Sequence, residues 1–181
     1  MSFTYKNQRT WQNAGSGISA FALLAPVSSF AVGGIKSPVA PFTSPGDSII
    51  IKTAHEFLAG LGFIYYALAP KKNQLDAKTI GDTGFNKQIQ EATIFIPGNS
   101  PAMMEQYQKL INVPLIVLVK DSNCAADLYM HMGCDCEGAF LAGDFATGTS
   151  DTGVKGITAK ITYDGPVQYY TVSGGPAIIA D

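Results

Sequence analysis

The chain has 181 residues, of which 46% are hydrophobic and only 14% charged, and its formal net charge is −2. This length and composition are typical of one folded domain with a sizeable core, and the charged fraction is well below the usual quarter. A surface so poor in charge carries neutral polar groups or apolar area, which favours a protein that joins with partners. The slight acidity and the scattered basic residues argue against a nucleic-acid reader, which needs clustered lysines and arginines.

Residues 1–17 are predicted to form a polar arm, and residues 18–181 a single domain. The arm carries three aromatic residues, Phe3, Tyr5 and Trp11. These side chains predict that the arm lies against a surface, either of its own chain or of a neighbouring copy. The apolar stretch Ile18–Val27 is diluted by small residues and falls short of the roughly 18 residues that cross a bilayer. We therefore expect no membrane span and no cleaved leader.

The first half of the domain reads mainly as strands. Ile18–Val32 predicts one or two short strands broken at Pro26, whereas Gly33–Gly46 contains three prolines and predicts a loop. Ser48–Lys52 predicts a compact strand. His55–Ala69 combines aromatic and β-branched residues with two glycines, so a strand with a bulge is expected there.

The next stretch of the chain predicts a hairpin with a long loop. Pro70–Gly84 is the most polar stretch of the chain and predicts a long mobile hairpin loop. Loops of this length are uncommon in compact domains unless they have a function. Phe85–Ile96 predicts a strand whose apolar residues change faces, with a kink near Glu91–Ala92.

One helix is expected after this strand. Asn99 or Ser100 is the predicted N-cap, Pro101 lies in the first turn, and Pro114 follows the end. An apolar stripe marks its buried face: Met103, Met104, Tyr107, Leu110 and Ile111.

The last third of the chain returns to strands. Leu115–Val119 is apolar on both faces, which predicts a central buried strand, and Ala126–Met132 alternates as a half-exposed strand does. Phe140–Gly156 predicts a flexible surface loop. Val154–Tyr163 and Val167–Val172 flank Asp164-Gly165 and predict a hairpin. About seven strands with one flanking α-helix indicate a mainly β protein, a sandwich or barrel.

Four residues could supply nitrogen and sulfur ligands to a zinc ion: Cys124, His131, Cys134 and Cys136. Only one residue separates Cys134 from Cys136, whereas structural zinc sites have two to four between paired cysteines. We interpret the thiols as half-buried small hydrophobes and His131 as a surface residue. The sequence therefore predicts no metal site.

Other patterns carry no chemistry either. Gly60-Leu61-Gly62 lacks the third glycine of a dinucleotide fingerprint, and Gly33-Gly34-Ile35-Lys36-Ser37 lacks the core of a phosphate loop. His55 and the acidic residues that could accompany it are scattered, so they are interpreted as surface charges. We expect no catalytic residue, no bound cofactor and no enzyme activity.

From Phe85 onward, the sequence resembles the tail tube (major tail) proteins of long-tailed bacteriophages, especially those that infect Bacteroidota. In that family, a strand ending in Asp-x-Asn leads to a turn, and a Thr-Gly-containing loop precedes a hairpin. The resemblance is carried by Phe85-Asn86-Lys87-Gln88, the helix through Leu110, Leu115–Asn123, Met132-Gly133, Thr147–Asp151 and Lys155–Tyr163. Cys124 stands where the family often has glycine, and Cys134-Asp135-Cys136 replaces a stretch usually free of cysteine.

The resemblance implies a structural virion protein, assembled in the host bacterial cytoplasm and located in the virion tail. Such subunits form homohexameric rings whose sheets join into an inner barrel, and the rings stack through a long hairpin loop and the chain termini. The loop at 70–84 and the arm at 1–17 are then the expected contacts. Other tail proteins are implied as partners, and DNA passes through the lumen without specific binding.

Two further interpretations remain open. A related virion protein that forms a single ring, such as a tail terminator or a head–tail connector, would share the fold. A monomeric β-sandwich binding module, for instance for carbohydrate, would need an exposed aromatic platform, and Tyr169-Tyr170 is the plausible pair.

Overall fold

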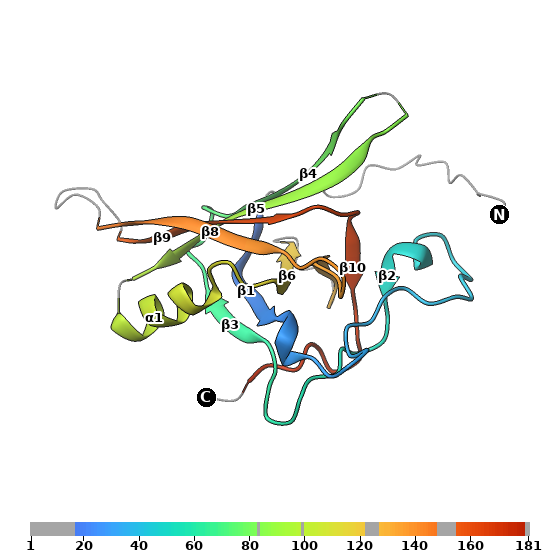
Figure 1. Ribbon diagram of the computed structural model, residues 1–181, viewed down its shortest axis with the longest axis horizontal. Helices are drawn as coiled ribbons and strands as arrows, with labels where there is room; N and C mark the ends of the chain where they lie inside the picture. Colours follow the sequence, from blue (N-terminus) through green and yellow to red (C-terminus); the bar gives the residue numbers. More distant parts are fainter. Residues whose placement is uncertain (1–16, 83, 99, 122–126, 148–154, 180–181) are drawn as a thin grey trace.

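Two β-sheets and one α-helix make up the described part of the chain (Figure 1). The computed structural model describes residues 17–82, 84–98, 100–121, 127–147 and 155–179. The expectation of a mainly β protein with a flanking helix is confirmed, because the two sheets face each other as a sandwich. The predicted arm at 1–17 lies outside the described residues apart from Gly17.

The first sheet has six strands, and its centre is the most apolar segment of the chain. All five residues from Leu115 to Val119 are fully buried, as predicted, because both faces of their strand are covered. All pairs are antiparallel except β2 with β10. In spatial order the strands are β2 (Ile50–Ile51), β10 (Gln168–Tyr170), β7 (Tyr129–Met132), β6 (Leu115–Asp121), β1 (Ile18–Pro26) and β3 (Ile64–Ala67).

The second sheet has four antiparallel strands in an unbroken register. Its order is β4 (Gln74–Ile80), β5 (Lys87–Pro97), β9 (Gly156–Tyr163) and β8 (Phe140–Ala146). The predicted kink near Glu91–Ala92 is wrong. Gln90, Ala92, Ile94 and Ile96 all face the core, so one face of β5 is buried from Gln90 onward without a change of side. The polar residue at position 90 concealed this alternation in the sequence.

The stretch predicted as a mobile loop at 70–84 contains β4, which pairs with β5 along its whole length. β4 is polar because it is the outermost strand of its sheet, where both faces remain in contact with water. The predicted hairpin is present, but its connecting loop is shorter than predicted because most of the stretch belongs to the strand β4. Likewise, the predicted surface loop at 140–156 begins with the strand β8.

The predicted hairpin around Asp164-Gly165 is also wrong, because β9 and β10 belong to different sheets. Gly165 does not adopt the left-handed backbone that the favoured two-residue turns require. The segment is a corner where the chain leaves one layer for the other. The buried side chain of Gln90 holds this corner, because its Nε2 donates to the Pro166 carbonyl oxygen at 2.8 Å.

Two other strands are shorter than predicted. Ser48–Lys52 reduces to a 3-10 turn at Asp47–Ile49 followed by β2. In the stretch His55–Ala69, only β3 is a strand, and Gly60 adopts a left-handed backbone in the turn before it. Pro26 ends β1 and begins a 3-10 turn at Val27–Ser29, as the break at this proline predicted.

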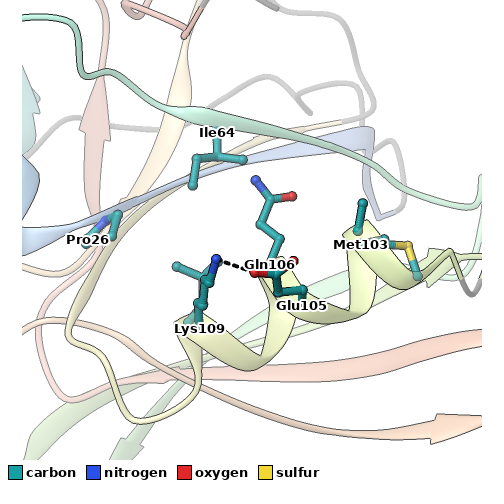
Figure 2. Close-up of a pocket in the computed structure, with 8 residues that line it drawn as sticks. Pro26, Ile64, Met103, Glu105, Gln106 and Lys109 are labelled. Carbon is teal, nitrogen blue, oxygen red and sulfur yellow. Dashed lines mark hydrogen bonds and ion pairs between the residues drawn. The ribbon is translucent and has the colours of Figure 1, made fainter.

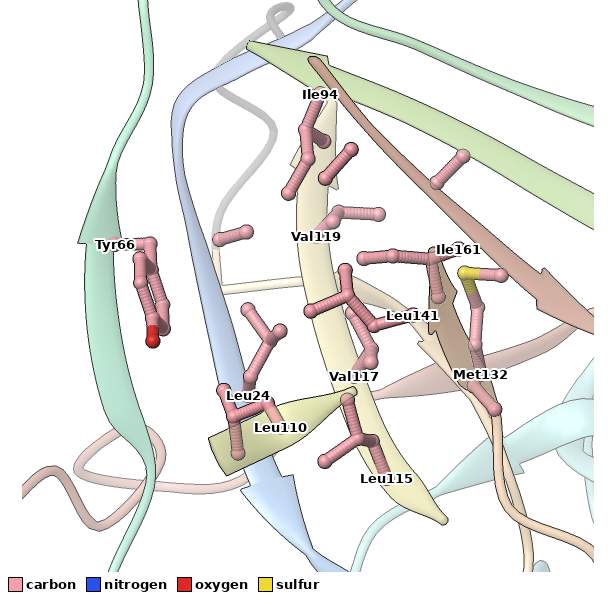
Figure 3. Packing of buried hydrophobic residues seen from close by; sticks show 14 of the residues in the cluster. Leu24, Tyr66, Ile94, Leu110, Leu115, Val117, Val119, Met132, Leu141 and Ile161 are labelled. Atoms are coloured by element: carbon pink, nitrogen blue, oxygen red, sulfur yellow. The ribbon is translucent and has the colours of Figure 1, made fainter. Parts of the chain in front are cut away.

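The main core lies between the two sheets and is closed at one end by α1 (Pro101–Leu110) (Figure 3). The Ser100 side chain accepts the Met103 N–H at 3.3 Å and caps the helix, and Pro101 occupies its first turn. Tyr107 and Leu110 are buried, whereas Ile111 at the end of the stripe is 37% exposed. Full burial of one such aliphatic side chain contributes about 2 kcal/mol to stability.

A second core covers the opposite face of the six-stranded sheet. Loops between β1 and β3 and after β10 lay Phe30, Phe63 and Val172 over the sheet residues Leu118 and Tyr170. The expectation of a half-exposed β7 is therefore wrong. His131 points into this second core and is 1% exposed.

Candidate assembly surface

Both lateral strands of the four-stranded sheet have one side without a strand partner within the described residues. β4 pairs only with β5, and β8 pairs with β9. One isolated bridge joins Leu141 near the start of β8 to Ile111, which leaves the rest of that edge without a ladder. Each edge strand is seven residues long. Unpaired edges of this length are templates for pairing with another chain.

The outer face of the four-stranded sheet is polar and balanced in charge. Glu91 on β5 forms ion pairs with Lys78 on β4, at 3.0 Å, and with Lys160 on β9, at 2.9 Å. Hydrogen bonds from the two ammonium groups lower the pKa of Glu91, and the same contact raises the pKa of Lys78. Lys87 pairs with Asp164 at the corner. Three lysines of this face thus have carboxylate partners, whereas Lys72 lies over the ring of Phe95, with its Nζ 4.7 Å from the ring centroid.

The β4–β5 hairpin extends beyond the sandwich as a two-stranded ribbon (Figure 1). β9 joins β5 only from Gln90 onward, so Lys87–Ile89 pair with β4 alone. The described residues at the end of this ribbon, 80–82 and 84–86, are called the tip. Two apolar side chains of the tip face water: Phe85, which is 86% exposed, and Ile80, which is 40% exposed.

A groove of about 700 Å³ lies between α1 and the neighbouring ends of β1 and β3 (Figure 2). We call it the α1 groove. Its apolar lining comes from Pro26, Ile64, Met103 and Leu110. Its polar lining is Gln106 together with the exposed ion pair of Glu105 and Lys109, whose atoms are 2.6 Å apart.

The zinc candidates do not form a ligand set in the part of the chain that the structure describes. His131 is buried, whereas Cys136 is exposed, and Cys134 lies in a turn where its sulfur accepts the Glu137 N–H at 3.2 Å. Cys124 lies outside the described residues.

The two histidines, interpreted from the sequence as surface residues, meet in the second core. Their ring centroids are 5.2 Å apart, and Tyr170 stacks on His55 at 4.6 Å. The Lys36 N–H donates to His55 Nδ1 at 3.0 Å, but His55 Nε2 and both ring nitrogens of His131 have no partner in the described part of the chain. Burial lowers the pKa of His55 to about 4 and that of His131 to about 3.

The aromatic platform proposed at Tyr169-Tyr170 is not present, because Tyr170 is 1% exposed. A different group stands on the uncovered part of the six-stranded sheet. Phe21 stacks on Tyr65 at 5.4 Å and meets Tyr129 edge-on at 6.4 Å. These residues come from β1, β3 and β7, so no local sequence pattern links them.

No family model, no curated protein and no solved structure matches this chain at a significant level. None of the helices among the described residues is long and apolar enough to span a membrane.

Proposed function

We propose that this chain is a structural virion protein, the subunit of a phage tail tube that stacks as homohexameric rings and conducts DNA. One observation carries the proposal: a single sheet, β4-β5-β9-β8, offers seven-residue edges at both of its sides. An edge that pairs with the opposite edge of a second copy makes a heterologous contact, and such contacts close into a ring when the rotation allows. The sequence resemblance supports the same class of protein.

Two further features support this reading. The β4–β5 ribbon projects along its strands beyond the sandwich, a position suited to a contact between one ring and the next. On the outer face of the same sheet, Lys78, Lys87 and Lys160 are held by carboxylates. Because these three lysines are already paired with carboxylates, the face has few cations left to bind phosphates, which favours passage of DNA over tight binding.

Electron microscopy of the purified protein, negatively stained over a range of concentrations, tests the proposal. Stacked rings or hollow tubes are the expected result, and single rings that never stack would instead indicate a terminator or connector. Hydrogen exchange sharpens the test, because pairing between copies would protect the outward-facing amides of β4 and β8, whereas their inward-facing amides are already paired with β5 and β9 in each subunit. A protein that stays monomeric at high concentration, with both edges exchanging freely, would contradict the proposal.

A monomeric binding module is the second candidate, and the cluster of Phe21, Tyr65 and Tyr129 favours it. Tyr65 is 52% exposed beside the half-buried ring of Phe21, an arrangement on which a planar ligand could stack. This candidate predicts a monomer that binds oligosaccharides and loses that binding when Tyr65 is replaced by alanine.

A further inference from the structure

We propose that His55 and His131 form an acid-sensitive latch, which holds a flap of loops on the six-stranded sheet and releases the flap when both rings take up protons. The flap consists of residues 29–36 and 55–58, two stretches of the connection between β1 and β3. The inference concerns the single subunit, so it does not depend on the tail-tube proposal.

The two stretches of the flap are bonded to each other. The Leu58 N–H donates to the Ser29 carbonyl oxygen at 3.0 Å, and the Ala31 N–H donates to the Glu56 carbonyl oxygen at 3.0 Å. The Glu56 N–H in turn donates to the Gly34 carbonyl oxygen at 2.9 Å. Because these bonds lie within the flap, they do not have to break when the flap leaves the sheet.

The flap packs on the sheet through aromatic rings of the second core. Phe30 and Phe57 stack at 4.3 Å and belong to the same apolar cluster as Leu118 and Tyr170 of the sheet. The His55 ring stacks on Tyr170 at 4.6 Å, and the His55 N–H donates to Tyr170 Oη at 3.2 Å. Release of the flap would uncover this face of the sheet, whereas the main core lies on the other face.

The two histidines belong to opposite sides of this contact. His55 is part of the flap, His131 lies on β7 in the sheet, and their ring centroids are 5.2 Å apart. Both residues are buried, and three of their four ring nitrogens have no hydrogen-bond partner in the described part of the chain. A proton added there is a buried charge without compensation. Two such charges would also repel each other across the contact.

The charged groups on the flap side do not offset a proton on His55. The Lys36 N–H donates to His55 Nδ1 at 3.0 Å, so a second proton on this ring must displace that bond. Burial and the positive charge of Lys36 lower the pKa of His55 to about 4. Glu56 forms an ion pair with Lys36 at 2.9 Å, and its side chain is 64% exposed, so its carboxylate is largely solvated.

The sheet side offers no compensating charge either among the described residues. The strand neighbours of His131 are Leu118 on β6 and Gln168 on β10, which are both uncharged. Tyr170 is the titratable neighbour on β10, and burial raises its pKa, so it stays neutral in acid. Burial and the charge of His55 lower the pKa of His131 to about 3.

His55 and His131 are the only histidines of the chain, so the side chains with an ordinary pKa between 5 and 8 act at this one contact. A ring that is freed by opening regains a pKa near 6.5, and at pH 5 its protonated form is favoured about 30-fold. Between pH 8 and pH 5, opening of the flap is therefore favoured about 30-fold by each ring and about 1,000-fold by both.

Cysteine labelling of the full chain tests the latch. Leu118→Cys places a thiol beneath the flap, and its matched control Val117→Cys places one on the opposite face of the same strand; both positions are fully buried. The reagent is a pyridyl disulfide that reacts in acid, peptide mapping separates the native cysteines, and each rate is divided by that of a free thiol at the same pH. The Leu118→Cys rate is expected to rise about 1,000-fold from pH 8 to pH 5. At pH 5 it should exceed the Val117→Cys rate by about tenfold or more, because the main core stays closed.

A variant of the latch separates its charges from its packing. In a His131→Leu background, the rise in the Leu118→Cys rate should shrink to about 30-fold, because one histidine remains. Equal rates for the two cysteines at pH 5 would show that the whole domain unfolds together. A Leu118→Cys rate that is independent of pH would show that the histidines do not hold the flap. Either result overturns the proposal.

Hydrogen exchange of the unsubstituted protein gives a second reading that does not depend on how the cysteine variants fold. The peptide that contains His55 should lose protection at pH 5 while the peptides of β5 and β9 keep theirs, since these strands belong to the main core. Simultaneous loss in all three peptides, or full protection around His55 at pH 5, would contradict the latch.

Discussion

The paired histidines of the second core predict that the protein loses stability between pH 8 and pH 5. Both rings are neutral when folded, because the pKa of His55 is lowered to about 4 and that of His131 to about 3. Burial is the main cause, and the positive charge of Lys36 adds to it at His55. No carboxylate among the described residues pairs with either ring, so a proton there would be an uncompensated charge.

The sign follows from proton binding. An unfolded histidine has a pKa near 6.5, so below that pH the unfolded chain binds protons at these two residues whereas the folded protein does not. Stability is therefore complete above pH 6.5 and is lost as the pH falls toward the folded pKa values. At pH 5 the unfolded state gains about 2 kcal/mol from each histidine, or about 4 kcal/mol in total. Since small domains are stable by about 5–15 kcal/mol, this loss is a large part of the whole.

Urea unfolding followed by far-ultraviolet circular dichroism at pH 8, 6.5 and 5 measures this loss, at protein concentrations low enough to avoid assembly. The His131→Leu protein should keep about 2 kcal/mol of the pH dependence and be no less stable at pH 8, because it removes two buried nitrogens without partners. The carboxyl of Asp47 does not interfere in this range, since its hydrogen bonds hold its pKa at about 2. An unfolding free energy that is flat from pH 8 to pH 5, or a His131→Leu protein with the full slope, would refute the reasoning.

Three other substitutions test the fold. Leu110→Asp places a charge at a side chain that is only 4% exposed and should leave the protein unfolded or aggregated; a cooperative melt with a native spectrum would contradict the packing of the helix. Ser100→Ala removes the cap on the Met103 amide and should lower the free energy of unfolding by about 1 kcal/mol in urea titrations. Gly165→Ala would put a Cβ within 2.3 Å of the Tyr163 ring and should cost about 1–3 kcal/mol, whereas an unchanged melting temperature would show that the corner yields freely.

The sequence predicts an element well when one physical cause dominates it. Leu115–Val119 was identifiable as a central strand because only burial on both faces suits five consecutive large apolar residues. The helix was identifiable because its cap, its proline and its stripe agree. β4 was missed for the opposite reason: an edge strand exposed on both faces has no alternation to read, so Gln74–Ile80 resembles a loop.

The candidate surfaces depend on contacts between distant residues, which a single sequence does not reveal. Asp164-Gly165 has the composition of a hairpin turn, yet the side chain of Gln90, 74 positions earlier, helps to direct the chain to the other sheet. His55 and His131 lie far apart in the chain, and histidine is a polar residue that is usually expected at the surface. The local sequence around each therefore does not indicate that the two rings meet in one core. Phe85 was predicted as the first residue of a strand, and its 86% exposure was not foreseen; the α1 groove likewise arises only when α1 packs beside β1 and β3.

The corner between the two layers gives the ribbon a mechanical role. Lys87 is tied to Asp164, the Val167 N–H donates to Gln88 Oε1 at 3.2 Å, and Gln90 holds Pro166. Three successive attachments thus fasten the base of this protruding lever to the segment that leads into β10. These contacts couple the position of the ribbon to the segment that leads into β10, so a displacement of the ribbon also strains the connection between the two sheets.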